Sequence, residues 1–244
     1  MTALFRGLAG RTVGPVWRRV LFQAGATRPV SVPPTLELRR DGVNLRGWLL
    51  NPDRDRALLY FGGNAERVED SLADLARWFP DHAAHVLAYR GYGASDGSPT
   101  ERALVADAVA LFDRAAHGRD SVAVIGRSLG SGVAVQLAVG RPVDRMVLVT
   151  PFDSIAAVAH EVVPRLPAWF PLTERFDSAA VAKDVVCPVL VVRAERDEVV
   201  SAARTQGLLE ALGDKAEAVV VRGTGHNDLH LQPSYAAALR AFLG

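Results

Sequence analysis

From residue 35 onward, short runs of apolar and β-branched residues alternate with longer stretches of helical periodicity. Continuous apolar runs are typical of parallel strands that are buried on both faces, and their alternation with helices indicates a sheet with crossover helices. The pattern predicts strands over 35–40, 43–50, 56–61, 84–89, 121–126, 144–149, 188–193 and 217–222. It predicts helices over about 66–78, 101–116, 129–139, 201–212 and 233–243. The first two strands flank Asp41-Gly42, which favours a hairpin turn, so we expect an α/β fold with a mostly parallel eight-stranded sheet flanked by helices.

One segment, residues 151–183, breaks this alternation. It carries Pro164, Pro167 and Pro171 beside aromatic residues, and we interpret it as a short lid inserted into the domain. Its apolar residues suggest a hydrophobic pocket, because small-molecule pockets are mostly apolar. The residues concerned are Val162, Val163, Leu166, Trp169 and Phe170, and we predict substrate binding by Leu166, Trp169 and Phe170.

The first 30 residues form a basic arm that differs from the rest of the chain. Apolar residues recur at helical spacing between Val13 and Ala24, and the arm holds five arginines and no acidic residue. Its short amphipathic helix has two interpretations: the apolar stripe packs on the protein or on a second copy, or it lies on an anionic membrane surface. We therefore divide the chain into an arm over 1–30 and one domain over 31–244, with the lid at about 151–183.

Composition restricts the class of protein further. The chain has 244 residues, of which 49% are hydrophobic, and 28 basic residues nearly balance 27 acidic ones. These values describe a soluble globular protein and exclude disorder. Cys187 is the single cysteine, which excludes an intramolecular disulfide and is consistent with a cytoplasmic protein. Residues 1–30 could add a peripheral contact with the membrane. The sequence does not determine the oligomeric state.

Several functions lack the residues they need. No basic face with stacking aromatics supports nucleic-acid binding, and no glycine-rich motif has the complete spacing that dinucleotides or nucleotides require. His226 and His230 have the spacing of a zinc-binding helix, but Asn227 stands where that motif has a glutamate. We therefore expect no metal and no cofactor.

The segment Gly126-Arg127-Ser128-Leu129-Gly130 is a G-x-S-x-G motif between a predicted strand and a predicted helix. In this context the motif forms a sharp turn that lifts the serine hydroxyl above the sheet. Ser128 is therefore the candidate nucleophile.

A serine hydroxyl needs a base to remove its proton and a carboxylate to orient that base. Asp197 follows the strand over 188–193 and His226 follows the last strand, which is the chain order Ser, acid, His of this motif's fold. Both positions lie at the carboxyl ends of strands, where open α/β sheets place their sites. We predict a triad of Ser128, His226 and Asp197.

Other residues compete for two of these roles. Glu195 and Glu198 flank Asp197, and Asp153 follows the preceding strand, so each of them could supply the carboxylate. His230 is the closest competitor of His226, although it lies beyond the glycine-containing turn.

Acyl transfer also needs donors for the oxyanion, which are usually the amide after the nucleophile and one amide from the loop after the third strand. Leu129 supplies the first. The second loop reads Phe61-Gly-Gly-Asn-Ala-Glu66, and its glycines allow backbone amides to turn toward a bound carbonyl. We predict the Asn64 N–H as the second donor.

Over about residues 35–244 the chain resembles the α/β-hydrolase superfamily. Phe61-Gly-Gly-Asn-Ala-Glu66, Tyr89-Arg-Gly-Tyr-Gly-Ala-Ser-Asp-Gly97 and Gly126-Arg-Ser-Leu-Gly-Ser-Gly132 look like its membrane-associated or depalmitoylase-like branch and bacterial relatives. Those relatives commonly have His-Gly-Asn where this chain has Gly62-Gly63-Asn64, and that histidine supports the loop more than it performs chemistry.

The resemblance implies a serine esterase, thioesterase or lipase-like hydrolase that acts on small-molecule acyl esters or thioesters. Two alternatives remain. One is a serine aminopeptidase-like peptidase, in which Glu66, Glu161 or Glu174 holds a substrate amino terminus. The other is a binding protein that keeps the fold without turnover.

Overall fold

Eight strands form one sheet in the computed structural model of the chain, which describes residues 17–19, 21–162 and 172–244. Their spatial order is β1-β2-β4-β3-β5-β6-β7-β8. β1, β2 and β4 pair antiparallel, and from β4 onward the neighbouring strands are parallel. The strands are β1 (Leu36–Arg40), β2 (Val43–Leu50), β3 (Arg56–Phe61), β4 (His82–Leu87), β5 (Ser121–Arg127), β6 (Arg145–Val149), β7 (Val189–Ala194) and β8 (Ala216–Val221).

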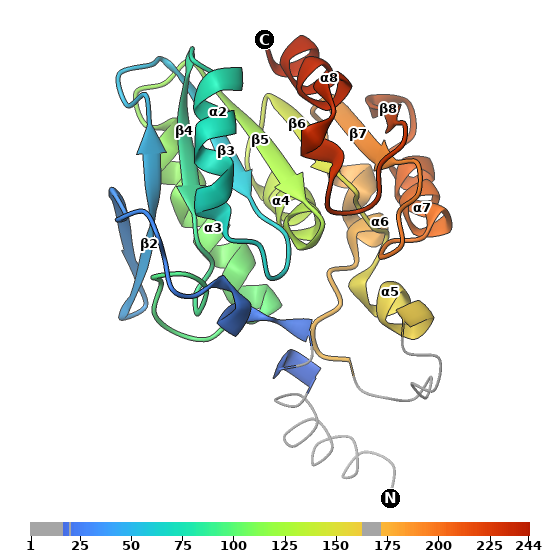
Figure 1. Cartoon of the computed structure of the whole chain (residues 1–244), viewed down its shortest axis with the longest axis horizontal. Coiled ribbons are helices and arrows are strands. Elements are labelled where there is room, and N and C mark those ends of the chain that lie inside the picture. Colours follow the sequence, from blue (N-terminus) through green and yellow to red (C-terminus); the bar gives the residue numbers. More distant parts are fainter. Residues whose placement is uncertain (1–16, 20, 163–171) are drawn as a thin grey trace, which may run out of the picture.

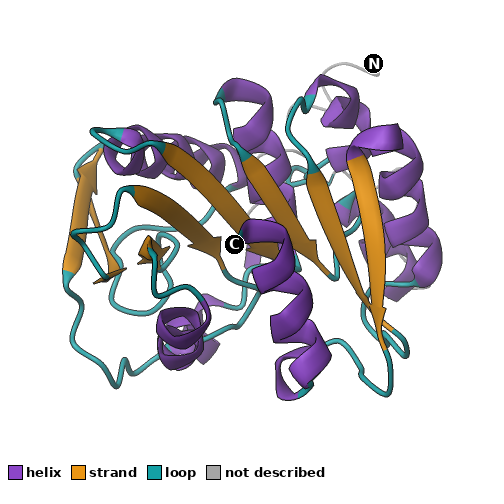
Figure 2. Cartoon of the chain, turned by 90° about the horizontal axis from the view of Figure 1, so that it is seen from above, coloured by secondary structure: helices purple, strands orange, loops and turns teal. Residues whose placement is uncertain are grey.

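Helices cover both faces of this sheet, as Figures 1 and 2 show. α2 and α8 lie on one face, where the rings of Trp78 and Tyr235 meet edge to face at 5.7 Å. α3, α4, α6 and α7 lie on the other. The helices are α2 (Leu72–Trp78), α3 (Glu101–Ala116), α4 (Leu129–Gly140), α5 (Ile155–Val162), α6 (Ser178–Val181), α7 (Ala202–Leu212) and α8 (Pro233–Leu243). Short 3-10 turns are η1 (Ala24–Thr27), η2 (Val68–Ser71), η3 (Ala182–Asp184), η4 (Gly213–Lys215) and η5 (Leu229–Leu231).

The predicted strands and helices are confirmed, with two shifts. The strand expected over 84–89 is β4, which begins two residues earlier at His82, so that His82 is a buried strand residue. The helix expected over 66–78 begins as the turn η2 and becomes α-helical only at Leu72. Its start is delayed because Ala65 has a positive φ of 59° and Glu66 turns back to accept the Gly63 N–H.

The core lies against the central strands, and this arrangement brings four loops together. Leu58, Val124, Val147 and Val191 have no exposed surface, and burial of such a side chain contributes about 1.5–3 kcal/mol. Because β3, β5, β7 and β8 run in parallel, their carboxyl ends lie along one edge of the sheet. The loops that follow these strands therefore meet at that edge.

The described part of the N-terminal arm packs on the body of the protein. Trp17, Leu21 and Phe22 are each less than 10% exposed and join the hydrophobic core. The apolar stripe has two interpretations, and these three residues follow the first, because they pack on the protein's own surface. Contact of the arm with a membrane remains a prediction. No helix within the described residues has both the length and the apolar character needed to cross a membrane.

The predicted lid is only partly described. α5, α6 and η3 lie within it, and Val162 at the end of α5 is exposed. Val163, Leu166, Trp169 and Phe170 lie outside the described residues, so their predicted role in substrate binding remains a prediction.

Candidate active site

Ser128 lies in a sharp turn between β5 and α4, as the motif predicts. Its φ of 49° and ψ of −113° are unfavourable for a residue with a side chain, and such strain is often concentrated at functional sites. The turn needs glycine on both sides. A Cβ on Gly126 would lie 2.4 Å from the Gly130 carbonyl oxygen, and a Cβ on Gly130 would lie 2.0 Å from the Phe61 carbonyl oxygen. The glycines thus allow α4 to approach β3 closely beneath the serine.

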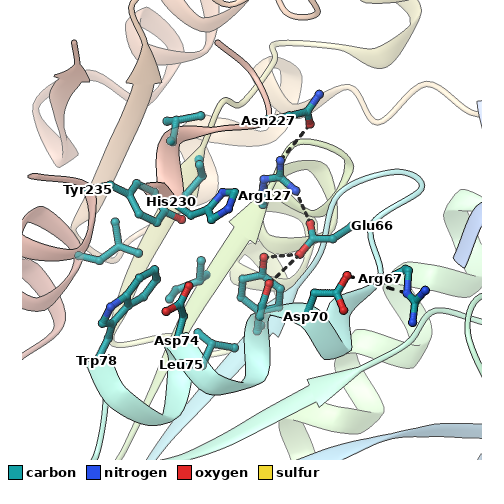
Figure 3. Close-up of a pocket in the computed structure, with 16 residues that line it drawn as sticks. Glu66, Arg67, Asp70, Asp74, Leu75, Trp78, Arg127, Asn227, His230 and Tyr235 are labelled. Atoms are coloured by element: carbon teal, nitrogen blue, oxygen red, sulfur yellow. Dashed lines mark hydrogen bonds and ion pairs between the residues drawn. The ribbon is translucent and has the colours of Figure 1, made fainter. Parts of the chain in front are cut away.

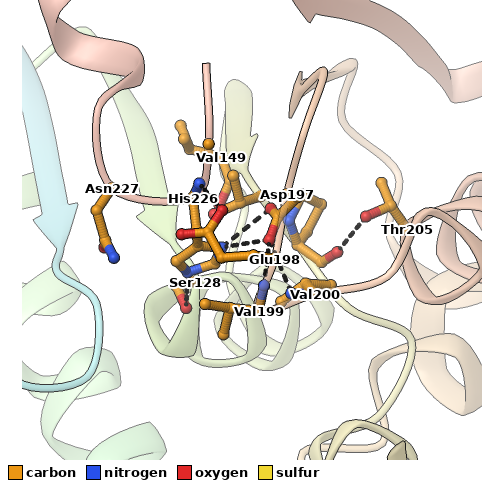
Figure 4. Close-up of polar contacts among 12 residues, drawn as sticks. Ser128, Val149, Asp197, Glu198, Val199, Val200, Thr205, His226 and Asn227 are labelled. Atoms are coloured by element: carbon orange, nitrogen blue, oxygen red, sulfur yellow. Dashed lines mark hydrogen bonds and ion pairs between the residues drawn. The ribbon is translucent and has the colours of Figure 1, made fainter. Parts of the chain in front are cut away.

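His226 reaches Ser128 from the loop after β8, as Figure 4 shows. The distance from His226 Nε2 to Ser128 Oγ is 3.0 Å, and the histidine is 4% exposed. His226 Nδ1 lies 2.9 and 3.0 Å from the two carboxylate oxygens of Asp197. Because a carboxylate only accepts hydrogen bonds, Nδ1 carries the proton and Nε2 is left to accept the serine hydroxyl. The three side chains form one continuous hydrogen-bonded series.

The loop after β7 keeps Asp197 ionised. The backbone amides of Val199 and Val200 donate to Asp197 Oδ1 at 3.0 and 2.8 Å. Burial alone would raise the pKa of Asp197, but the hydrogen bonds from His226 and these amides outweigh it, so the pKa lies below the usual range of an aspartate. The carboxylate is therefore charged and can stabilise a positive charge on the imidazole.

The loop after β3 passes directly beside the nucleophile. A Cβ built on Gly63 would lie 3.5 Å from Ser128 Cβ, and the Gly63 N–H is occupied because it donates to Glu66 at 2.6 Å. Within the described part of the chain, the backbone amides of Asn64 and Leu129 donate no hydrogen bond to another protein group. Their predicted role as oxyanion donors remains a prediction that this geometry accommodates.

Gly62 stands where the resemblance led us to expect a histidine. A Cβ at this position would lie 2.5 Å from Val68 Cγ1, so the packing of Val68 leaves no room for a larger residue. The loop is held instead by Tyr89, whose hydroxyl donates to the Gly62 carbonyl at 2.9 Å, and by Glu66.

A buried ion pair that sequence reasoning missed connects the same loop to the serine and histidine loops (Figure 3). Glu66 accepts hydrogen bonds from Tyr60 Oη at 2.6 Å and Arg127 Nη1 at 2.7 Å. Arg127 also donates to the His226 carbonyl at 3.4 Å and to Asn227 Oδ1 at 3.1 Å. In the sequence, Glu66 is a candidate substrate ligand of a peptidase and Arg127 is only the variable residue of the motif.

Electrostatics favour the charged form of this pair. Burial opposes ionisation of Glu66, but Arg127 and the hydrogen bonds from Tyr60 and Gly63 outweigh it and lower the pKa of the carboxyl group. Burial raises the pKa of Tyr60, which therefore remains a donor. The pair borders a cavity of about 240 Å³ between α2 and α8, into which Tyr235 and His230 also face.

The residues that compete for the acid and base roles have other partners. Asp153 pairs with Arg204 at 2.9 Å. Glu195 accepts the Gly223 N–H at 2.8 Å, and Glu198 accepts the backbone N–H of His226 at 3.0 Å. His230 lines the cavity and makes no contact with Ser128 among the hydrogen bonds described. The structure therefore brings together the three predicted residues, and places their rivals around them.

Comparison with known sequences shows the family of this chain. Residues 58–185, about half of the chain, match the family described as alpha/beta hydrolase fold, and residues 167–244 match one described as TAP-like protein. This chain belongs to the α/β-hydrolase family.

Relatives of this α/β-hydrolase occur in bacteria and animals. An uncharacterized protein of Mycobacterium tuberculosis is 36% identical over 201 residues, which are 79% of this chain and 71% of that protein. The lysophosphatidylserine lipase ABHD12 of Danio rerio is 35% identical over 59% of this chain and 44% of the lipase. The human alpha/beta hydrolase domain-containing protein 17B is 31% identical over 64% of this chain and 54% of that protein. The hydrolase chain thus spans about half the length of these animal relatives.

Solved structures share the fold of this α/β-hydrolase at low sequence identity. An esterase of Pyrococcus furiosus is 18% identical, covers 88% of this chain and 93% of its own, and superposes with a TM-score of 0.71. Est1E of Butyrivibrio proteoclasticus, solved with ferulic acid bound, is 17% identical over 86% of this chain and 98% of its own, with a TM-score of 0.67. At these identities the likeness shows the fold alone.

Proposed function

We propose that this chain is a serine hydrolase that cleaves carboxylic ester or thioester bonds of small-molecule acyl substrates. The observation that carries the proposal is the series Asp197–His226–Ser128, with gaps of 2.9 and 3.0 Å, in which the serine occupies a strained turn between β5 and α4. The support comes from the distances between these side chains and not from the residue types alone. A nucleophile within hydrogen-bond distance of a base, which is itself oriented by a carboxylate, is the arrangement used for acyl transfer.

The chemistry follows from the position of each proton. Ser128 Oγ attacks the carbonyl carbon as His226 Nε2 takes its proton, and the electron pair of the carbonyl moves to the oxygen. The resulting imidazolium is stabilised by ionised Asp197, to which Nδ1 already donates. Collapse of the tetrahedral intermediate breaks the bond to the leaving group, which takes the proton from Nε2. Water then repeats the sequence on the acyl-enzyme and releases the acid.

The amides of Leu129 and Asn64 would bind the oxygen that becomes negative in this step. Leu129 N begins α4, whose positive end favours a negative charge, and Asn64 lies on the adjacent loop beside Ser128. Donors that are fixed in place before the reaction stabilise the transition state without reorganisation.

The choice of an acyl ester or thioester rests on the relatives. The Danio rerio relative is named as a lysophosphatidylserine lipase, and the Pyrococcus furiosus structure is named as an esterase. Both names describe cleavage at a carboxylic ester, so an ester carbonyl is the substrate class that the site and the relatives support together. A thioester has the same reacting carbon and needs the same groups.

The structure gives less support to peptidase activity, because the glutamates that could bind a substrate amino terminus already have partners. Glu66 is occupied by Arg127, Tyr60 and the Gly63 amide. Glu174 and Glu161 are each paired with an arginine. None of these carboxylates is therefore free to hold the amino terminus of a substrate.

Labelling with a fluorophosphonate tests the proposal. The wild-type protein should form a covalent adduct, Ser128→Ala should form none, and Ser98→Ala, which removes an exposed serine far from the site in sequence, should label at the wild-type rate. Turnover should then be compared among nitrophenyl esters of rising chain length, an acyl thioester and aminoacyl amides. Folded wild-type protein that neither labels nor turns over would instead identify a binding protein, and preference for the amides would identify a peptidase.

A further inference from the structure

The side chain of Asn64 joins the N-terminal arm to the loop beside the nucleophile. Its amide nitrogen donates to the Leu21 carbonyl at 2.5 Å, and its Oδ1 accepts the Gln23 N–H at 3.0 Å. Oδ1 also accepts the hydroxyl of Tyr92 at 2.8 Å. Two of these partners are backbone groups of the arm, more than 40 residues away in sequence, so the arm lies directly against the loop that follows β3.

The arm is itself fixed on both sides of this contact. The indole of Trp17 donates to the Glu174 carbonyl at 3.3 Å, and Arg18 pairs with the Glu174 carboxylate at 2.5 Å. Glu174, which is 2% exposed, also accepts the N–H of Glu101 where α3 begins. On the other side, Arg28 donates to the Ser95 carbonyl at 3.1 Å. Residues 17–19 and 21–28, called the docked segment below, are therefore held by charged and apolar contacts.

The loop needs such support because few of its side chains can provide it. Gly62 and Gly63 have no side chains, and Ala65 occupies a positive φ of 59°. Glu66 fixes the Gly63 N–H. The Asn64 side chain anchors the loop to the arm, and the backbone amide of the same residue is the one proposed to bind the oxyanion. Small displacements of such a donor reduce its effect, because it must be aimed before charge develops.

We propose that the docked segment is a positioning element of the active site, in which the Leu21 carbonyl and the Gln23 N–H hold Asn64 so that its amide points at the oxyanion. This inference rests on the proposed function and adds to it. The docked segment contributes to the catalytic rate in addition to its packing against the core. Because the effect acts on the transition state, loss of the contact lowers kcat and leaves KM nearly unchanged.

The test compares full-chain variants that break the contact at either end. Asn64→Ala removes every side-chain contact and keeps the backbone N–H. Trp17→Phe combined with Arg18→Gln releases the docked segment from Glu174 while it keeps most of the buried apolar volume. Tyr92→Phe is the matched control, because it removes a side-chain partner of Asn64 that does not belong to the arm. In each variant kcat is divided by the number of active sites titrated with a fluorophosphonate, and folding is followed by circular dichroism and thermal unfolding.

We expect Asn64→Ala to lower kcat per active site by about 10–100-fold with KM within about twofold, which is less than the loss from removing an oxyanion donor outright. The arm variant should lower kcat in the same direction by a smaller factor, and Tyr92→Phe by less again. Most importantly, the arm variant combined with Asn64→Ala should be no slower than Asn64→Ala alone, because both act through one contact.

A purely structural role of the arm would give a different result. It would lower the thermal stability and the fraction of active sites while kcat per active site stayed at the wild-type value, or its effect would multiply with that of Asn64→Ala. Either outcome overturns the inference. If Asn64→Ala does not fold, Asn64→Asp keeps the size and the acceptor but places an oxygen against the Leu21 carbonyl, and the same loss of kcat is expected. Wild-type protein without labelling would contradict the proposed function itself, which is a separate result.

Discussion

The loops after β6 and β7 leave neighbouring strands at the same edge of the sheet, and each carries an aspartate. In the β7 loop Asp197 lies 2.9 Å from His226, whereas in the β6 loop Asp153 lies 2.9 Å from Arg204 of α7. The two aspartates have the same chemistry and similar positions in the fold. Their different partners give one a place in the proposed reaction and the other a place in the packing of α7.

The charges of the two carboxyl groups differ in the same way. Burial raises the pKa of Asp153 above the usual range, and Arg204 offsets this only in part. For Asp197 the hydrogen bonds from His226 and two backbone amides outweigh burial and lower the pKa. An acid that supports an imidazolium must be ionised, so partner geometry and protonation both point to Asp197.

Of the substitutions that distinguish the two aspartates, Asp197→Asn should have the largest effect on kcat. An amide at this position can no longer hold the required tautomer of His226, and the analogous change in another serine hydrolase lowers kcat by about 10⁴-fold. Steady-state kinetics on a nitrophenyl ester would measure the loss. A rate near that of the wild type would move the acid role to Asp153 or to a neighbouring glutamate.

The two aspartates should also affect stability with opposite dependence on pH. The pKa of Asp197 is lowered by folding, so its contribution is present at neutral pH and is lost as pH falls through the folded pKa. The pKa of Asp153 is raised, so its contribution is greatest at low pH and is lost as pH rises through its folded pKa. Chemical denaturation of the wild type, Asp197→Asn and Asp153→Asn between about pH 3 and pH 7 would measure both. Parallel curves for the two variants would contradict the assigned shifts.

Glu198→Gln distinguishes support of the histidine loop from the acid role itself. Glu198 accepts the backbone N–H of His226 at 3.0 Å, and a neutral glutamine oxygen can still accept that hydrogen bond. We expect a loss in kcat of about fivefold, the equivalent of about 1 kcal/mol for one weakened hydrogen bond. A loss as large as that of Asp197→Asn would show that Glu198 orients the imidazole.

Asp153→Asn should have the smallest effect. Its pair with Arg204 is partly exposed, and Arg204 retains a second partner in Glu161 at 2.9 Å. We expect kcat within about twofold of the wild type and a loss of stability of no more than about 1 kcal/mol. The kinetic assay used for Asp197→Asn serves as the direct comparison, and a large loss of kcat would assign Asp153 to the reaction.

The sequence predicted most of the fold because its signals are local. β2 and β3 were predicted with the observed bounds, since turn residues flank both strands. β4 was placed two residues too late because its first residue, His82, is polar and resembles a loop residue in the sequence. The delayed start of α2 depends on Glu66 folding back onto Gly63, and no periodic pattern reports such a contact.

Part of the candidate site could also be predicted from the sequence. The G-x-S-x-G motif and the chain order Ser, acid, His pointed to Ser128, His226 and Asp197, and left Asp153, Glu195 and Glu198 as competitors for the acid role. The pair of Glu66 and Arg127 was not predicted, because its members are 61 residues apart and neither of the motifs that contain them indicates a contact between the two. The contact of Asn64 with the arm was missed for the same reason.

By itself, the sequence determined the turn at Ser128, because a serine between two glycines after a buried strand is constrained by the sterics of a few adjacent residues. Only the tertiary structure decided which carboxylate meets His226, what pairs with Arg127 and what holds Asn64. These choices depend on hydrogen bonds of 2.5 to 2.9 Å between groups far apart in sequence: Asp197 and His226 are separated by 29 residues, Asn64 and Leu21 by 43, and Arg127 and Glu66 by 61. Such groups meet only after strand order and loop packing have brought the chain's distant segments to one edge of the sheet.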